Sequence, residues 1–267
     1  MIIIQPSGGL CNRMRVICSG WELARRRNEK LKVLWNCNTE LNCPFHTLFQ
    51  PIREFPIVNI HSVADPRKLF YQKTARSYLT NQEILAHRGA DGALEADYAA
   101  GLSSNCYIFT WEQFYPISGY ELFVPTQPLQ RRIQAMTERF GPSCVGVHIR
   151  RTDNLPAKGK SSTEAFLASM SRELEKDPSV LFYLATDDME EEARLREVFP
   201  GRVLSNQKRC LRRDSVEGMQ DALLDLYCLA ATRKIIGSYF SSFTDIAADM
   251  HKIPKLIAGA SDDGDAL

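Results

Sequence analysis

The sequence lacks most of the short motifs that identify a protein's chemistry. Its 267 residues contain no Cys-x-x-Cys pair and no Asn-x-Ser/Thr acceptor, and neither a Gly-x-Gly-x-x-Gly nor a Walker loop for phosphate. The eight cysteines are scattered among apolar segments, which is typical of buried free thiols rather than of zinc sites or disulfides. No basic segment precedes a long apolar run at the N-terminus, so we predict neither a signal peptide nor a membrane anchor. A cytoplasmic protein is the simplest expectation.

An excess of charge of one sign is also missing. The formal net charge of +1 gives no overall field for nucleic acid or an anionic membrane surface, so we predict no nucleic-acid partner. No transmembrane segment is expected either. Any anion site must therefore be built locally from clustered arginines. What is present is an ordinary globular composition, 44% hydrophobic and 24% charged, which suffices for one large core or two modest ones. Only residues 261–267 are too polar to bury, and we expect a flexible acidic tail there.

The order of apolar and amphipathic segments predicts an α/β protein. Strands are expected at 2–5, 32–35, 57–60 and 106–111, a helix at 13–27, and an irregular stretch at 36–101. Prolines in the segment 123–128 predict a linker, which divides an N-terminal α/β domain (1–124) from a C-terminal Rossmann-like domain (125–260). The second domain alternates strands at 144–150, 180–185, 202–205, 234–238 and near 256 with helices at 129–139, 162–175, 189–198, 217–232 and 243–250. Such alternation predicts parallel βαβ units, whose ligands bind beyond the carboxyl ends of the strands.

Two of the loops at those carboxyl ends carry the clearest polar patterns. In the first, Gly8 and Gly9 let a backbone approach a ligand closely, and Asn12 is a candidate cap for the following helix. A plain turn between strand and helix is an equally good interpretation. In the second, His148 is followed by Arg150 and Arg151, whose two guanidiniums form a good clamp for pyrophosphate. The alternative is an exposed arginine pair bridged to Asp153.

Three further features have both a structural and a functional interpretation. Asp188 is expected to cap the helix that follows it, whereas Asp187 is placed to orient the loop or an arginine of the site. Ser241 and Ser242 precede another helix, where hydroxyls and amides suit phosphate but also an ordinary cap. Asp225 lies in an apolar helical segment, so its carboxylate needs water, a basic partner or a ligand. A solvent-facing stripe shared with Gly218, Asp221, Cys228 and Thr232 is the alternative.

Taken together, these segments resemble the fucosyltransferase superfamily, and the α1,6-fucosyltransferase branch looks most similar. The superfamily also includes α1,2- and protein O-fucosyltransferases. The matching segments are residues 8–13, 148–153 with 163–166, 183–188, 223–226 and 237–242. They occur in the family's order and span nearly the whole chain. The His-x-Arg-Arg-Thr-Asp segment is specific, and the order of the segments adds force to the weaker motifs.

The resemblance implies a GT-B-like fold of two Rossmann-type domains with parallel sheets facing a cleft. The first domain is expected on the acceptor side, and the second is expected to hold most of the donor. It also implies an inverting, metal-independent glycosyltransferase that moves fucose from GDP-fucose to a hydroxyl of a glycan or glycoconjugate. No cofactor and no metal ligands are expected. Two alternatives stay open: a transferase for another GDP-sugar or nucleotide sugar, and a non-catalytic module that binds nucleotides or RNA.

The family's functional residues can be carried over onto matching positions. Arg150 would bind the donor diphosphate, and Arg151 would support it or orient the loop. His148 and Asp225 would hold the guanine and ribose side of GDP. The remaining predicted donor contacts are Gly8, Gly9, Asn12, Asp187, Ser241 and Ser242.

A general base is also implied near the acceptor. The family position corresponds to Glu164, which would take the proton of the acceptor hydroxyl. The segment from Ser161 to Glu164 also has the pattern of a capping box, so cap and base are equally good interpretations. Asp153 is the second candidate base.

Overall fold

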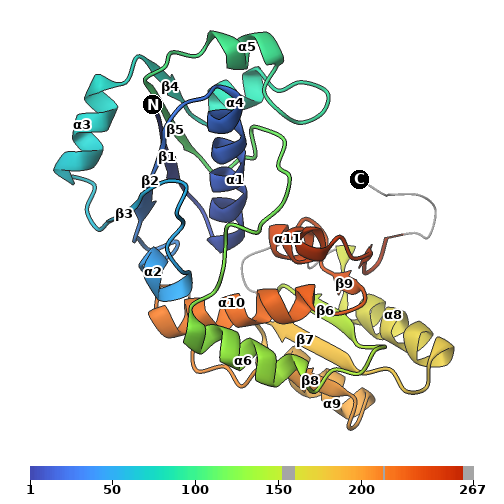
Figure 1. Cartoon of the computed structure of the whole chain (residues 1–267). Helices are drawn as coiled ribbons and strands as arrows, with labels where there is room; N and C mark the ends of the chain where they lie inside the picture. The colour runs from blue at the N-terminus through green and yellow to red at the C-terminus, as the bar shows by residue number, and fades with distance from the viewer. Residues whose placement is uncertain (152–159, 213, 261–267) are drawn as a thin grey trace. The chain divides into compact units, whose positions relative to one another are not determined.

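The chain folds into two compact units, each built on its own parallel sheet. The structure, a computed structural model, describes residues 1–151, 160–212 and 214–260. Unit 1 comprises Met1–Thr126 with Arg212–Gln220, and unit 2 comprises Gln127–Leu211 with Asp221–Leu267. Each unit contains a five-stranded sheet flanked by helices (Figure 1). The predicted α/β class is therefore confirmed.

Unit 1 has the strand order β3-β2-β1-β5-β4, with every neighbouring pair parallel. Its strands are β1 (Ile2–Pro6), β2 (Leu31–Asn36), β3 (Ile57–Ile60), β4 (Ser77–Leu79) and β5 (Cys106–Thr110). Its helices are α1 (Leu10–Arg26), α2 (Phe45–Leu48), α3 (Pro66–Thr74), α4 (Asn81–Ala86) and α5 (Ala96–Gly101). All of β1 is buried, as a central parallel strand covered on both faces requires.

Helix α1 packs directly on β1. A Cβ atom added to Gly20 would lie 1.6 Å from Cδ1 of Ile4, so only glycine permits this approach of the helix to the strand. The side chain of Ile3 belongs to a different cluster, with Leu34, Ile60 and Tyr107. Because successive side chains alternate between the faces of a strand, these contacts place apolar layers on both faces of the sheet.

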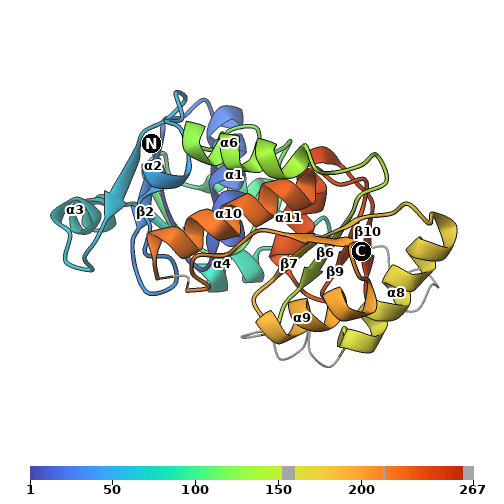
Figure 2. The same cartoon turned by 90° about the horizontal axis from the view of Figure 1, so that it is seen from below.

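Unit 2 has the strand order β10-β9-β6-β7-β8, again parallel throughout. Its strands are β6 (Val145–Ile149), β7 (Phe182–Thr186), β8 (Val203–Ser205), β9 (Ile235–Gly237) and β10 (Lys255–Ile257). Its described helices are α6 (Gln127–Thr137), α8 (Thr163–Lys176), α9 (Met189–Val198), α11 (Ser242–His251) and the part of α10 (Val216–Ala230) that starts at Asp221. Figure 2 shows α6 running beside α10, and an ion pair between Arg132 and Asp221 joins these two helices.

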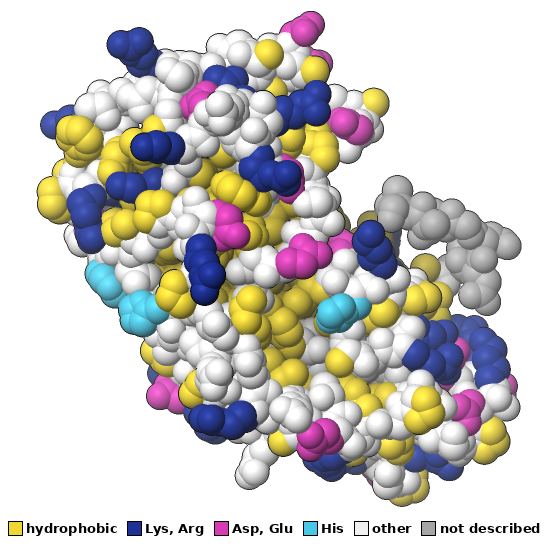
Figure 3. Space-filling model, in the orientation of Figure 1, with side chains coloured by type: hydrophobic (Ala, Val, Ile, Leu, Met, Phe, Trp, Pro, Cys, Tyr) yellow, Lys and Arg dark blue, Asp and Glu magenta, His cyan; other side chains and the backbone are white. Residues whose placement is uncertain are grey.

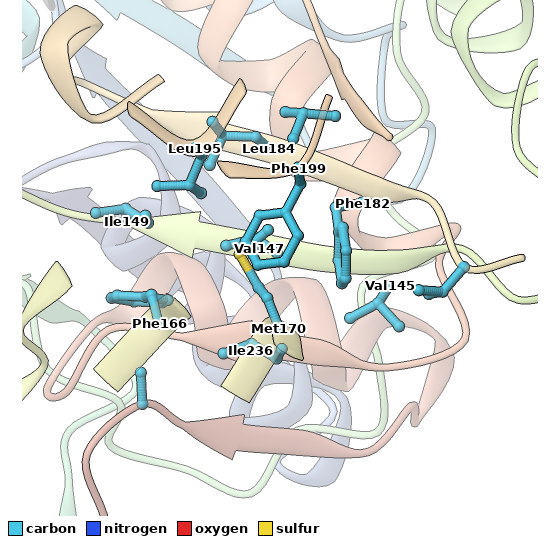
Figure 4. Packing of buried hydrophobic residues seen from close by; sticks show 13 residues of the cluster. Val145, Val147, Ile149, Phe166, Met170, Phe182, Leu184, Leu195, Phe199 and Ile236 are labelled. Carbon is cyan, nitrogen blue, oxygen red and sulfur yellow. The ribbon is translucent and has the colours of Figure 1, made fainter. Parts of the chain in front are cut away.

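In unit 2, the side chains of β6 alternate between an apolar core and the opposite face of the sheet. Val145, Val147 and Ile149 point to one face, where they meet residues of α8 and α9 such as Phe166 and Leu195 (Figure 4). The intervening His148 points to the opposite face, which α10 and α11 cover. The alternation predicted for this strand thus puts its one titratable side chain on the face opposite that apolar cluster.

Three local expectations are wrong or incomplete. Helix α1 begins at Leu10 rather than at residue 13, and its N-cap is Gly9 with no side-chain cap bond. Asn12 therefore lies in the first turn and does not cap the helix, because the buried Leu10 and Cys11 extend the apolar face toward the N-terminus.

The predicted linker is shorter than expected because α6 already includes Gln127 and Pro128. Proline is tolerated in a first turn, where its missing N–H would have no acceptor within the helix. The stretch 36–101 contains α2 to α5 and β4 besides the correctly predicted β3, and its short elements lack the periodicity that reveals longer ones. Within the described part of the chain, no helix is both long and apolar enough to span a membrane.

Candidate functional site

The ends of β6 and β7 bring opposite charges together in unit 2. Arg150 follows β6 and Asp187 follows β7, and the Arg150 Nη1 atom lies 3.2 Å from Oδ2 of Asp187. The other oxygen of Asp187 accepts a hydrogen bond of 2.8 Å from the backbone N–H of Arg151. The side chain of Arg150 keeps 20% of its surface exposed. Asp187 therefore holds both a guanidinium and the backbone that follows it, the two structural tasks predicted for it.

Arg151 is buried and has other partners. Its Nε atom lies 2.7 Å from Oε1 of Glu191, and its Nη1 donates to the backbone oxygen of Ser161 at 2.8 Å. The guanidinium also lies 5.7 Å from the ring centre of Phe166. These contacts tie the loop after β6 to α8 and α9, so they favour the loop-orienting role for Arg151. Asp153, the partner in the alternative interpretation, lies outside the described residues.

Two serine hydroxyls, of Ser238 and Ser161, fix the loop between β9 and α11. Oγ of Ser238 accepts from the backbone N–H of Arg150 at 2.9 Å and donates to the carbonyl of His148 at 3.2 Å. Oγ of Ser161 accepts from the backbone N–H of Tyr239 at 3.0 Å and donates to the carbonyl of Ala258 at 2.7 Å. Single serines in loops give no periodic signal, so only the fold reveals that these hydroxyls anchor the strand ends.

Ser241 and Ser242 stand at the start of α11. Ser241 is the N-cap residue, but its side chain makes no capping hydrogen bond, and Ser242 is the first helical residue. The ordinary-cap interpretation therefore does not account for the Ser241 hydroxyl. The first amides of a helix have no partners within that helix and favour an anion, so this end of unit 2 has the chemistry that phosphate requires.

His148 is buried, with 5% of its surface exposed. Its Nδ1 atom lies 2.8 Å from the hydroxyl of Thr244, and its ring stacks on Phe243 with ring centres 4.8 Å apart. Burial, with the nearby charge of Arg150, lowers the pKa of His148 to about 3. The imidazole is thus neutral near pH 7, and it can act as a hydrogen-bonding group but not as a cation.

Asp225 has the basic partner that its apolar surroundings demand. Its Oδ1 accepts from the hydroxyl of Tyr183 at 2.7 Å, and Nζ of Lys208 lies 3.3 Å from its Oδ2. Burial raises the pKa of Asp225, and the charge of Lys208 opposes that shift. Lys208 was not among the predicted site residues, although it belongs to a basic run that follows the carboxyl end of β8.

The alternative of a solvent-facing stripe on α10 is wrong. Asp221, Asp225, Cys228 and Thr232 are all at most 4% exposed. Asp221 pairs instead with Arg132 and Arg209, with N–O distances of 2.7 and 3.0 Å. A helix with buried carboxylates at two successive turns needs cations from other segments, and the fold supplies them.

Glu164 is not part of a capping box. The N-cap of α8 is Ser162, whose hydroxyl accepts from the backbone N–H of Ala165 at 3.2 Å. Glu164 is the second helical residue, and its side chain is 71% exposed and pairs with Arg194 at 3.1 Å. Hydrogen bonds from its own backbone N–H and from Arg194 lower its pKa. The capping prediction was wrong by one residue because Ser161 is buried and used elsewhere.

In unit 1, a buried arginine shapes the loop after β1. Gly8 has a positive φ of 77°, which favours glycine, and its carbonyl accepts from Nε of Arg13 at 2.8 Å. The Arg13 guanidinium is fully buried and also binds the carbonyl of Asn36 and the side chain of Asn38. The backbone N–H of Gly8 donates to Glu40 at 3.0 Å. Arg13 thus links the carboxyl ends of β1 and β2 and holds Gly8 in place.

The chain is similar in structure to known proteins, but its sequence matches none of the family models or curated proteins compared with it. The fucosyltransferase NodZ from Bradyrhizobium superposes with a TM-score of 0.61 at 20% identity, covering 92% of this chain and 92% of that one. Arabidopsis thaliana FUT1 in complex with GDP gives 0.61 at 14% identity, covering 95% of this chain and 69% of that one. POFUT1 in complex with GDP-fucose gives 0.58 at 11%, covering 97% and 98%.

This chain has the GT-B fold of the fucosyltransferases. The predicted resemblance to the fucosyltransferase superfamily is thereby confirmed at the level of the fold. In this GT-B chain the described residues contain no group of His, Cys, Asp and Glu side chains that could hold a metal ion.

Proposed function

We propose that this chain is an inverting, metal-independent fucosyltransferase that moves fucose from GDP-fucose to a hydroxyl of a glycan or glycoconjugate. The observation that carries the proposal is the position of Arg150 at the carboxyl end of β6. There, Asp187 holds its guanidinium and Ser238 holds its backbone. The GT-B neighbours solved with GDP or GDP-fucose support this choice of donor.

The proposed chemistry depends on fixed positive charge. When the bond to the sugar breaks, negative charge develops on the GDP that leaves, and Arg150 would stabilise it without reorganising, because its loop is already held. Ser241, Ser242 and the amides at the start of α11 would bind phosphate oxygens. Arg151 would act through its contacts with Glu191 and Ser161 as a positioning residue. Gly8, Gly9 and Asn12 are proposed as donor contacts on the resemblance alone.

The proposed guanine contacts are His148 and Asp225. An ionised carboxylate offers about four lone-pair positions, so the bonds from Tyr183 and Lys208 leave Asp225 able to accept from the guanine N1 and N2 hydrogens. Lys208 favours the ionised form of this buried carboxyl. Acceptance from the neighbouring N1 and N2 hydrogens is what would distinguish guanine from the other bases.

The proposed general base is Glu164, with Asp153 as the second candidate. Glu164 is exposed, and a carboxyl in water is ionised at neutral pH. An ionised carboxylate in contact with solvent can take a proton from an incoming hydroxyl. Its ion pair with Arg194 orients the side chain at the start of α8.

The alternatives make different demands on the surface and the site. A module that binds RNA would need basic residues interleaved with exposed aromatics across one face. On the face drawn in Figure 3, lysines and arginines stand among acidic, hydrophobic and uncharged side chains, which does not favour that alternative. A transferase for another GDP-sugar would use the same guanine and diphosphate contacts and differ only in the sugar.

A thermal-shift comparison of GDP, UDP, CMP and ADP, with and without magnesium, tests the proposal. A ligand at a hundredfold excess over its Kd stabilises the native state by about 2.7 kcal/mol, so GDP should raise Tm selectively. The one Asp-x-Asp spacing in the sequence, Asp263 and Asp265, lies outside the described residues, and the magnesium arm tests it directly. An equal response to all four nucleotides, or a response to GDP only with magnesium, would contradict the proposal.

A further inference from the structure

A half-exposed tryptophan stands at the carboxyl edge of the sheet in unit 1. Trp111 directly follows β5 and is 47% exposed, whereas Trp35 is fully buried. Because this large apolar side chain stays in contact with water, the folded protein lacks much of the stabilisation that its burial would give. Ligands of parallel α/β sheets bind at this edge, so the place of Trp111 suggests a ligand contact.

Two polar side chains from other segments approach the same point. A Cβ atom added to Gly8 would lie 3.4 Å from Cβ of Trp111 and 3.0 Å from Nδ2 of Asn12. The N–H of Gly8 also binds Oε2 of Glu40, a side chain that is 46% exposed. Gly8 thus has three side chains near it: Trp111 directly after β5, Asn12 in the first turn of α1, and Glu40 in the segment after β2.

The backbone on which this cluster is built is fixed by hydrogen bonds. The N–H of Trp111 donates to Oδ1 of Asn81 at 3.2 Å, and the hydroxyl of Thr110 donates to the same oxygen at 2.5 Å. The N–H of Ser7 donates to the carbonyl of Thr110 at 2.9 Å, which joins the two strand ends. A ligand would therefore meet side chains on an ordered edge, which limits the entropy lost on binding.

We propose that Trp111, with Glu40 near it at Gly8, binds a pyranose ring of the acceptor saccharide. The apolar C–H face of the ring would stack on the indole, and its hydroxyls would donate to Glu40. The inference rests on the proposed function for the role of this saccharide as acceptor.

The test is a titration of the whole chain with cellotriose, maltotriose and chitotriose, followed by calorimetry and tryptophan fluorescence. At least one trisaccharide should bind, and Trp111→Ala should weaken its affinity about tenfold or more because the flat apolar face is lost. Trp111→Tyr should retain most of the affinity. The matched control is Phe70→Ala, which removes another exposed aromatic of unit 1, 61% exposed on α3, and should leave the affinity unchanged.

Binding of none of the three saccharides, or full affinity in Trp111→Ala, would overturn the proposal. Should the alanine variant fail to fold, Trp111→Leu, which is apolar but has no flat face, takes its place with the same expected loss. GDP is titrated into the same proteins, and its affinity should not change in Trp111→Ala. If the unmodified chain did not bind GDP, the proposed function would be contradicted instead. The saccharide titration would still show whether Trp111 binds a sugar.

Discussion

Arg150 and Arg151 are neighbours in the sequence with different surroundings in the fold. Arg150 keeps a fifth of its side chain exposed beside Asp187, whereas Arg151 is 9% exposed and bound to Glu191. The sequence could place both residues at the end of a buried strand, but it could not assign their partners. The difference between a ligand-facing and a structural arginine follows from α8 and α9, because among the described residues Glu191 of α9 and Thr163 of α8 bind the Arg151 side chain.

We predict that Arg150→Ala abolishes most GDP-fucose turnover while the protein stays folded. Loss of one fixed group that stabilises developing charge typically lowers kcat about 10²–10³-fold. Arg150→Lys should restore little, because an ammonium cannot make the paired contact. The measurements are turnover and Tm. Arg151→Ala is the matched control: it should cost about 3–5 kcal/mol of stability because Glu191 loses its buried partner. Near-normal turnover in Arg150→Ala would rule out the diphosphate role.

Asp225 and Asp221 form a natural pair for testing guanine recognition. Both are buried on α10, and each is paired with cations. Asp225→Asn should weaken GDP binding by about tenfold or more, because a neutral amide forms weaker hydrogen bonds with guanine than a carboxylate does. Asp221→Asn should lower Tm without changing GDP affinity, since its partners are Arg132 and Arg209. Calorimetry measures the GDP affinity of both variants. Equal affinities in the two would contradict the guanine assignment.

At the scale of secondary-structure elements, periodicity explains both the successes and the failures of prediction. Helix α9 matches its predicted range of 189–198, and β3 matches 57–60. Long amphipathic helices and buried strands repeat a pattern that can be read from the sequence. Boundaries depend on single residues instead: Gly9 caps α1, Pro128 enters α6, and Ser162 rather than Ser161 caps α8. The loops of the site follow predictable strands, so they were predicted. Contacts between segments far apart in the sequence leave no periodic pattern, so the tertiary partners Lys208, Tyr183, Ser238 and Thr244 were not.

Helix α8 gives a prediction that separates catalysis from capping. Because the cap is Ser162, Glu164→Gln should leave stability nearly unchanged, whereas Ser162→Ala should cost about 1 kcal/mol. If Glu164 is the base, its Gln variant should lose roughly two to four orders of magnitude in turnover with GDP affinity intact. Turnover, GDP affinity and denaturant unfolding of both variants measure these effects. Full activity of Glu164→Gln would transfer the proposed role to Asp153.

For the molecule as a whole, His148 predicts how stability responds to acid. Its pKa is lowered from 6.5 to about 3 in the folded chain, so between these values the unfolded chain binds a proton that the native state does not. Stability should therefore fall as pH decreases through this window, by at most about 1.4 kcal/mol per pH unit from this group. His148→Gln should reduce that slope, as measured by urea unfolding from pH 7 to pH 4. The exposed His251→Gln should not, and identical slopes in all three proteins would show that His148 is not buried in its neutral form.

Unit 1 is discontinuous in the sequence, and this imposes an order on its completion during synthesis. Its first part ends at Thr126, but its last part, Arg212–Gln220, is separated from it by much of unit 2. Asn42 donates to the carbonyl of Asp214, and Gln220 donates to that of Thr47, so this late segment bonds directly to early residues. At roughly 5–20 residues per second, the ribosome delivers it on the order of ten seconds after Thr126. The nascent chain must therefore keep the surface around α2 open until residues far downstream have been translated.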